Sequence, residues 1–286
     1  MQPEAGREVN EVRYVGVDIG KWKCRAAMMN PDGAIVEEFT FPNDAEGIHD
    51  LASRLTPEDR VVMESTGSVW ANLYNSLDER RVPVVLANPL KPRAIASARI
   101  KTDKVDARIL AHLVRSSLVA ECYVPPRNLR ELRALVRHRA SLVRARTTVK
   151  NRVHALLDGH GLRCEYSDLF GKRGTEWLRS LDLGALDNLM LRSHLEQVKS
   201  LSRQVEEADE EIRCRASLDG DVRLLLSLTG VDVYTALLIR SEIGSIDRFP
   251  DYRRLVSWAE LAPSLHQSGS VEFRGGITRQ GSRMLR

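Results

Sequence analysis

Short apolar runs separated by turn signals fill the first part of the chain. Residues 13–18, 23–29 and 34–41 are rich in β-branched and other apolar side chains, and Asn-Pro-Asp-Gly at 30–33 is a strong turn signal between the last two runs. This pattern predicts a meander of three antiparallel strands.

Helical and strand-like patterns alternate after the meander. Residues 45–55 and 69–80 carry apolar side chains at helical spacing, whereas residues 60–64 and 82–87 are short apolar runs bounded by polar residues. Strands that alternate with helices indicate an α/β sheet with helices packed on its faces.

Four acidic residues fall where such a fold brings segments together. Asp18 and Glu64 end two of the predicted strands, and ligand sites of open α/β sheets lie at the carboxyl ends of strands. Asp103 and Asp106 are three residues apart in a predicted helix over residues 100–113, so both carboxylates share one helical face. On its own, this pair is typical of a solvated helix start.

Together, four carboxylates are the ligand set that two-metal phosphodiester chemistry requires. Mg²⁺ is a hard cation that prefers oxygen ligands, so the four acids predict a Mg²⁺ site. A competing interpretation takes Val-Gly-Val-Asp-Ile-Gly at residues 15–20 as the first phosphate turn of an actin-like or sugar-kinase ATPase. Such a protein would need a second Gly-rich phosphate turn, and none precedes the basic helix described next.

The pattern changes after residue 126. Residues 127–157 predict one long helix with a basic face, and residues 191–214 predict a second with near-heptad apolar spacing and an acidic outer face. The two helices are expected to pair antiparallel with each other or with copies of themselves. The predicted buried face of the first helix contains Leu129, Leu132, Val136, Val143, Val149, Val153 and Leu156. Its candidate nucleic-acid contacts are Arg130, Arg133, Arg137, Arg144, Lys150 and Arg152.

A glycine turn and a tail rich in Gly, Ser and Arg follow. Gly230 separates two apolar helical halves within residues 221–243, as in a helix-hairpin-helix whose turn amides meet a phosphate. An ordinary pair of helices joined by a turn is the alternative. Residues 252–260 predict a short helix, and the tail beyond them shows no strong element before a helix expected near Ser282.

Composition narrows the class of protein. The 286 residues suffice for two domains, and although the net charge is only +4, arginines cluster between residues 127 and 152, which favours a polyanionic partner. Four scattered cysteines with no Cys-x-x-Cys spacing fit reduced thiols. The sequence shows neither eighteen consecutive apolar residues nor the apolar run of a signal peptide, so we expect a cytoplasmic protein without a membrane partner.

Several stretches of the chain resemble the DEDD-type transposases of bacterial insertion sequences. These are VGVDIGK at residues 15–21, VVMESTG at 61–67 and NPLKPRAIASARIKTDKVDARILA at 88–111. Downstream, LTGVDVYTALLIRSEIG at 228–244 and the closing pattern SGxxxxxGGITRQGSRxLR at 268–286 resemble the C-terminal domain of the same family. The resemblance covers nearly the whole chain.

The resemblance implies three regions. Residues 1–125 would form an α/β catalytic domain with a RuvC-like, ribonuclease-H fold. Residues 126–218 would form a long helical, coiled-coil-like insertion for dimerisation and RNA binding. Residues 219–286 would form a mainly α-helical C-terminal transposase domain that carries a catalytic serine loop.

The resemblance also implies roles for individual residues. Asp18, Glu64, Asp103 and Asp106 match the DEDD tetrad of the family, which binds Mg²⁺. Ser268 matches the C-terminal serine that attacks the DNA phosphate and forms a covalent phosphoserine link.

The residues around the serine leave alternatives open. Ser270 is a second candidate for the nucleophile, and a flexible Gly/Ser loop without chemistry is the alternative to both. Arg274 and Arg279 are candidates for contacting the phosphate, because a guanidinium group binds phosphate oxygens in a bidentate manner.

The function implied by the resemblance is recombination of donor and target DNA by an insertion-sequence transposase, guided by a structured noncoding RNA in a bacterial, nucleoid-associated setting. The active form would be a homodimer or a dimer of dimers, with the carboxylates of one subunit facing the serine of another. We expect the basic helix to bind A-form RNA by contacting the phosphate backbone of the RNA.

Two other functions remain open at this stage. One is a metal-dependent nuclease or junction resolvase, in which water attacks. The other is a truncated nucleic-acid-binding remnant, because members of the family normally continue with a further helical segment where this chain ends at Arg286.

Overall fold

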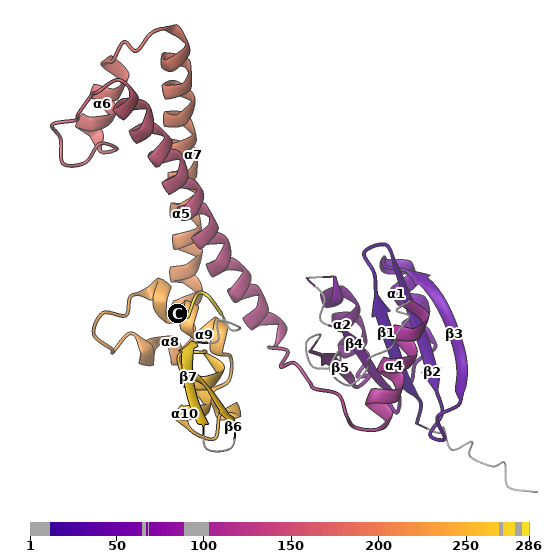
Figure 1. Ribbon diagram of the computed structural model, residues 1–286. Coiled ribbons are helices and arrows are strands. Elements are labelled where there is room, and N and C mark those ends of the chain that lie inside the picture. The colour runs from indigo at the N-terminus through magenta and orange to yellow at the C-terminus, as the bar shows by residue number, and fades with distance from the viewer. Residues whose placement is uncertain are drawn as a thin grey trace, which may run out of the picture. The chain divides into compact units, whose positions relative to one another are not determined.

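The computed structural model describes residues 12–64, 67, 69–88, 103–268, 271–277 and 282–285, with the backbone alone described at 103–105, 264–268 and 271–274 (Figure 1). The chain divides into two compact units, residues 1–124 and residues 125–286, and each is described by itself. Among the described residues, no helix combines the length and the hydropathy that a membrane span requires.

The first unit is built on one five-stranded sheet with the order β3-β2-β1-β4-β5. Its strands are β1 (Tyr14–Ile19), β2 (Lys23–Met29), β3 (Ile35–Pro42), β4 (Arg60–Glu64) and β5 (Val84–Ala87). The first three pair antiparallel, whereas β4 pairs parallel with β1 and β5 parallel with β4. The predicted meander and α/β sheet are therefore confirmed, with strand ends within two residues of those expected.

Helices cover both faces of this sheet. On one face α1 (Ala45–Ser53) and α2 (Trp70–Glu79) bury a core that includes Val15, Val17 and Leu73. On the other face α4 (Asp103–Arg115) contributes Leu110 and Val114 to a smaller cluster with Val62 and Ala87. Alternate strand residues point to opposite faces, which is why Val61 and Val62 lie in different clusters.

The second unit contains two long antiparallel helices, α5 (Arg127–Gly159) and α7 (Ala185–Ser217), with α6 (Lys172–Ser180) between them in sequence (Figure 1). We call residues 127–217 the helical arm. The two predicted helices were expected to pair antiparallel with each other or with copies of themselves, and within this chain they pair with each other. The sequence pattern predicted that Val143 and Leu156 of α5 are buried, but the buried residues are their neighbours Leu142 and Leu157. An α-helix drifts by about 20° per heptad, so over 33 residues its buried face moves by about one position.

Shorter elements pack at the base of the arm. They are α8 (Gly220–Leu225), α9 (Val233–Ile243), the 3-10 helix η1 (Ile246–Arg248) and α10 (Tyr252–Trp258). Gly230 has a φ of 87°, so glycine suits the turn between α8 and α9. Val136 of α5, Ile212 of α7 and Leu237 of α9 belong to one buried cluster, so residues on both sides of position 218 share a core.

The tail contains strands that the sequence pattern did not reveal. β6 (Pro263–Ser268) and β7 (Val271–Ile277) form an antiparallel two-stranded sheet, so the expectation of no strong element there was wrong. The alternation at residues 271–274 is the period-2 signal of a strand, but glycines on both sides obscure it.

The helix expected near Ser282 was also wrong, because residues 282–285 form a turn. In this turn Leu285 N–H donates to the carbonyl of Ser282, and Met284 N–H donates to its hydroxyl. Such side-chain hydrogen bonds compete with helix formation.

Candidate active site at the sheet edge

Asp18 of β1 and Glu64 of β4 lie side by side at the carboxyl ends of adjacent parallel strands. The register of these strands runs from Tyr14 opposite Arg60 to Val17 opposite Met63, and its next step sets Asp18 beside Glu64. Neighbouring strands are about 4.8 Å apart, so both carboxylates project from one edge of the same face. Both residues are half-buried.

Gly16 explains how α4 comes to lie on this face. A Cβ at Gly16 would stand 2.1 Å from the carbonyl oxygen of Ala107 and 2.5 Å from the backbone nitrogen of Ala111, so only glycine allows this approach. Asp18 is two residues further along β1 and therefore points to the face that α4 covers.

α4 runs antiparallel to β1, so its N-terminal end lies at the end of the sheet where Asp18 is found. Its last residue, Arg115, donates to the carbonyl of Pro31 over 3.1 Å, and Pro31 is in the turn that follows β2 at the opposite end of β1. Leu110 packs on Val62 of β4, two residues before Glu64. Asp106 is one helical turn before Leu110 and is half-buried.

The backbone thus gathers Asp18, Glu64 and Asp106 at one corner of the sheet. Asp103 is the first residue of α4, and its side chain lies outside the described residues. Carboxylate oxygens suit Mg²⁺, so the donor set fits that ion. Among the described side chains, however, no group of three or more Asp, Glu, His or Cys is close enough to hold a metal.

Cys24 pairs in register next to the strand end of Asp18 but packs in the core on the other face of the sheet. Burial raises the pKa of the Cys24 thiol to about 11, and the negative charge of Asp18 adds to the shift. A thiol binds metal as the thiolate, which a raised pKa disfavours at neutral pH.

The predicted serine belongs to the second unit. Ser268 is the last residue of β6 and pairs with Val271, the first residue of β7. Arg274 lies in β7 opposite Leu265. Ser270 and Arg279 lie outside the described residues.

Several cations of α5 contact groups of the second unit itself. Arg137 donates two hydrogen bonds, of 2.7 and 2.9 Å, to the buried carboxylate of Glu242 in α9, and Arg133 donates to the carbonyls of Ser241 and Glu242. Arg130 donates to the carbonyl of Pro125. These three guanidinium groups attach α5 to neighbouring backbone and to α9.

The remaining predicted cations of α5 lie further along the helix. Arg144 contacts the sulfur of Met284 over 3.4 Å, and the ammonium of Lys150 lies 4.6 Å from the centre of the Phe170 ring. Arg152 is exposed. The basic face predicted from the sequence is therefore partly engaged in holding the second unit together.

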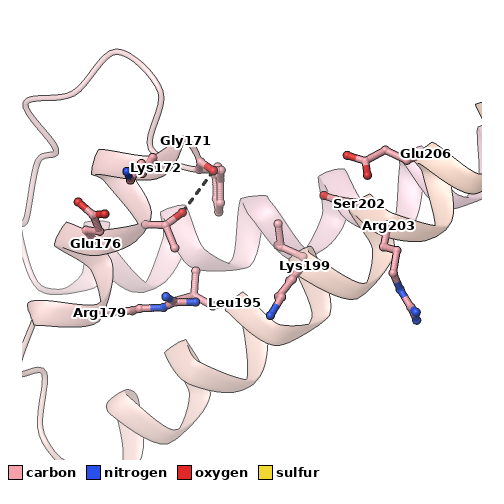
Figure 2. A pocket seen from close by; sticks show the side chains of 12 residues that line it. Gly171, Lys172, Glu176, Arg179, Leu195, Lys199, Ser202, Arg203 and Glu206 are labelled. Carbon is pink, nitrogen blue, oxygen red and sulfur yellow. Dashed lines mark hydrogen bonds between the residues drawn. The ribbon is translucent and has the colours of Figure 1, made fainter.

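A second basic surface, which the sequence pattern did not single out, lies between α6 and α7. It is a hollow of about 500 Å³, and Figure 2 shows Lys172 and Arg179 of α6 with Lys199 and Arg203 of α7 around it. All four side chains are exposed. Two acids, Glu176 and Glu206, also line the hollow, which leaves it an excess of two positive charges among its lining residues.

Local helix energetics oppose some of these cations, although Arg179 is in the last turn of α6, where the helix dipole favours a positive charge. Lys172 is in the first turn of α6, where no acidic residue and no side-chain cap offset the positive end of the helix dipole. Lys199 and Arg203 are four residues apart on α7, a spacing at which like charges repel. Arg203 also lies 3.8 Å from Glu207. The sequence pattern predicted no helix at α6, so the pairing of these cations from α6 and α7 could not be read from the sequence.

Comparisons with known proteins identify relatives over nearly the whole chain. A family model described as a transposase, of the DEDD type named after IS110, matches residues 15–161. Another, described as "Transposase IS116/IS110/IS902 family", matches residues 222–286.

Individual relatives cover the chain almost completely. The putative transposase y4qE of Sinorhizobium fredii is 28% identical, covering 98% of this chain and 71% of that protein. The transposase for insertion sequence element IS1111A of Coxiella burnetii is 24% identical, over 98% of this chain and 76% of that protein. The pilin gene-inverting protein of Moraxella bovis is 26% identical, over 96% and 79% respectively.

Proposed function

The chain belongs to the IS116/IS110/IS902 family of transposases, and from this premise we propose that it cuts and rejoins DNA through a serine–phosphate intermediate at a Mg²⁺-assisted site. Family membership supports DNA transposase or recombinase activity. A relative named as a pilin gene-inverting protein indicates that rearranging a DNA segment is within the range of such proteins.

The observation that carries the proposal is the convergence of acids at one sheet edge. Asp18 and Glu64 are adjacent in register, and α4 brings Asp106 to the same corner. We propose a RuvC-like, ribonuclease-H fold for this unit, and the sheet order β3-β2-β1-β4-β5 with one antiparallel meander supports it.

In this proposal Asp18, Glu64, Asp103 and Asp106 hold the metal. Bound Mg²⁺ would stabilise the negative charge that develops on a phosphate under attack. The acids supply oxygen ligands from two strands and one helix, and Gly16 sets the helix at the required distance. The half-buried position of Asp18, Glu64 and Asp106 limits access of bulk water to their oxygens.

Ser268 supplies the nucleophile. Its hydroxyl oxygen forms a bond to phosphorus and loses its proton, while the bond from phosphorus to one sugar oxygen breaks and that oxygen takes up a proton. Attack of a second strand's hydroxyl on the phosphoserine reverses these steps. A phosphodiester is therefore replaced by another phosphoester at each stage, so strand exchange needs no external energy source.

The proposed partners are donor DNA, target DNA and a structured noncoding RNA that guides the choice of site. We also propose a dimer, and a dimer of dimers when active, in which acids of one subunit act with the serine of another. The location of acids and serine in different units of the chain is compatible with this arrangement.

Covalent trapping tests the proposal. The chain is incubated with the RNA of its element, end-labelled DNA and Mg²⁺, and the products are separated under denaturing conditions. A labelled band that migrates with the protein and disappears after protease treatment supports serine attack. Cut DNA that never carries protein contradicts it.

We further propose that the hollow between α6 and α7 contacts the phosphate backbone of the nucleic acid. Its lining carries four exposed cations against two acids, and Lys172 stands at the positive end of the α6 dipole, a local conflict of the kind found at functional surfaces. Backbone contact fits the absence of exposed aromatic side chains among its lining residues.

Neutralising two of these cations is expected to weaken nucleic-acid binding. In Lys199→Gln/Arg203→Gln, the slope of log K against log salt concentration should fall by about 0.7–0.9 per lost phosphate contact. Arg213→Gln/Arg223→Gln removes the same charge from exposed positions outside the hollow and serves as the control. Fluorescence anisotropy across a salt series measures both variants on RNA and on DNA duplexes. Equal losses in the two variants would show that the hollow has no special role.

A further inference from the structure

An exposed tryptophan stands on the turn that joins β1 to β2. Trp22 is 75% exposed, and among the side chains that the structure describes no other aromatic is more exposed. The turn follows Ile19, the last residue of β1, so it lies at the end of the sheet where Asp18, Glu64 and Asp106 gather, which we call the acid corner. Trp22 follows Asp18 by four positions, a stretch of backbone that reaches at most about 14 Å.

Hydrogen bonds tie this turn to the end of β3. Gly20 N–H donates to the carbonyl of Lys23 over 3.1 Å. Asn43, which follows β3, donates its backbone N–H to the carbonyl of Trp22 and its side-chain amide to the carbonyl of Gly20, both over 2.9 Å. A Cβ at Gly20 would stand 2.4 Å from the carbonyl oxygen of Lys23, so the turn needs glycine. The indole is thus presented from an ordered backbone, which lowers the entropy lost when a ligand binds.

Two lysines flank the tryptophan. Lys21 and Lys23 are both exposed, and the ammonium of Lys21 lies 5.0 Å from the centre of the Trp22 ring, over one face of it. A single exposed apolar side chain is ordinary on a protein surface. An indole between two cations is more specific, because single-stranded nucleic acid is bound by stacking a base on an aromatic ring while cations meet the phosphates.

The surroundings favour a nucleic acid over a protein as the ligand of this turn. Lysine is depleted at protein–protein interfaces, so two lysines beside the indole do not suit a protein partner. The acids that follow Asn43 in sequence are explained by α1: Asp44 is its N-cap and accepts from Gly47 N–H, and Glu46 is in its first turn, where an acid offsets the helix dipole.

We propose that Trp22 is a stacking platform for an unpaired base of a nucleic-acid strand at the acid corner, with Lys21 and Lys23 on the phosphates that flank this base. The inference rests on the proposed function, since it states how a strand is held beside the acids. It requires a single strand there, because a base inside a duplex has no face open to the indole. Stacking tolerates every base, so the platform positions the strand without reading its sequence.

Binding of oligonucleotides to the full chain tests this platform, measured by fluorescence anisotropy in EDTA so that no cleavage contributes. The ligands are a DNA single strand, an RNA single strand of the same sequence and the matching DNA duplex. We expect Trp22→Ala to weaken single-strand binding about tenfold and duplex binding less than about twofold, whereas Trp22→Phe keeps a ring and most of the affinity. The matched control is Tyr166→Ala, which removes an exposed aromatic side chain flanked by Glu165 and Ser167 instead of cations.

Intrinsic fluorescence locates the bound base. The chain has four tryptophans, so the signal of Trp22 is the difference between the wild type and Trp22→Phe. A single strand should quench this signal, because a stacked base quenches indole fluorescence, and an abasic strand with the same phosphates should not. Quenching by DNA alone or by RNA alone supports the platform and identifies the strand that it holds.

Three results would overturn the platform. They are a Trp22 signal that no single strand quenches, equal quenching by the abasic strand, and equal affinities of Trp22→Ala and Tyr166→Ala. Thermal unfolding of each variant should match the wild type, because the substituted side chains are exposed. Covalent trapping is read separately: an adduct without any Trp22 effect leaves the proposed function standing and rejects the platform, and a Trp22 effect without an adduct does the reverse.

Discussion

Asp106→Asn is expected to reduce Mg²⁺-dependent strand cleavage about a thousandfold while leaving the chain folded. The substitution keeps the shape of a half-buried side chain but removes the charge by which it would hold the metal. A thousandfold loss corresponds to about 4 kcal/mol of transition-state stabilisation, a magnitude typical of losing an electrostatic group of an active site.

The measurement is the initial rate of cleavage of labelled DNA at saturating RNA and Mg²⁺, with EDTA-treated wild type as the reference for complete loss. Glu58→Gln serves as the control, since it neutralises an exposed acid of the same unit outside the corner. If Asp106→Asn cleaves DNA at the wild-type rate, this residue is not part of the proposed metal site. If Glu58→Gln loses as much activity as Asp106→Asn, the loss comes from the change in net charge.

Local signals made the acid corner predictable in part. Asp18 and Glu64 each follow an apolar run directly, so their place at strand ends is readable from neighbouring residues. The position of α4 is not, because it depends on a contact between Gly16 and Ala107, which are 91 residues apart. Gly16 looks in sequence like one more small residue of a strand, and only the packed helix explains it.

The basic face of α5 was predicted from the sequence, but the partners of its cations were not. Counting arginines along one helix predicts a charged surface, but it cannot show that Glu242, 105 residues from Arg137, provides a buried partner for it. A buried carboxylate is costly without such partners, so tertiary packing engages cations that the pattern assigned to contacts with nucleic acid. The hollow at α6 was missed for a related reason: its cations come from two helices and converge only in the folded arm.

The tail was the least predictable part. Glycines at residues 269, 275 and 276 indicate a loop, yet β6 and β7 pair through backbone hydrogen bonds that do not depend on side-chain hydrophobicity. Ser268 is therefore a strand residue with a defined partner, Val271, rather than part of an irregular segment. Its identification as the nucleophile comes from the family resemblance, which makes it the residue whose role most needs a direct test.

Ser268→Ala is expected to abolish the protein–DNA adduct entirely and to reduce strand exchange by a thousandfold or more, on the order of 4 kcal/mol. The hydroxyl oxygen is the atom that joins phosphorus in the proposed intermediate, and alanine has none. Ser270→Ala should retain the adduct. The assay is the covalent trapping described above, followed by mapping of the labelled peptide.

Each alternative function predicts a different result. Cleavage that continues in Ser268→Ala without any adduct would identify a nuclease in which water attacks, and an adduct lost only in Ser270→Ala would move the nucleophile by two residues. Loss in Ser268→Ala together with loss in Asp106→Asn supports a composite site that needs both residues.

Mixing the two inactive variants then decides whether the composite site is shared between subunits. The Asp106→Asn chain keeps the serine, and the Ser268→Ala chain keeps all the acids. If the site is shared between subunits, an assembly of the two variants contains intact sites that combine these two parts. Activity should therefore return on mixing, and the adduct should form on the Asp106→Asn chain alone, which a mass tag on one variant reveals. If acids and serine of the same chain act together, no mixture contains an intact site, and activity stays absent at every ratio.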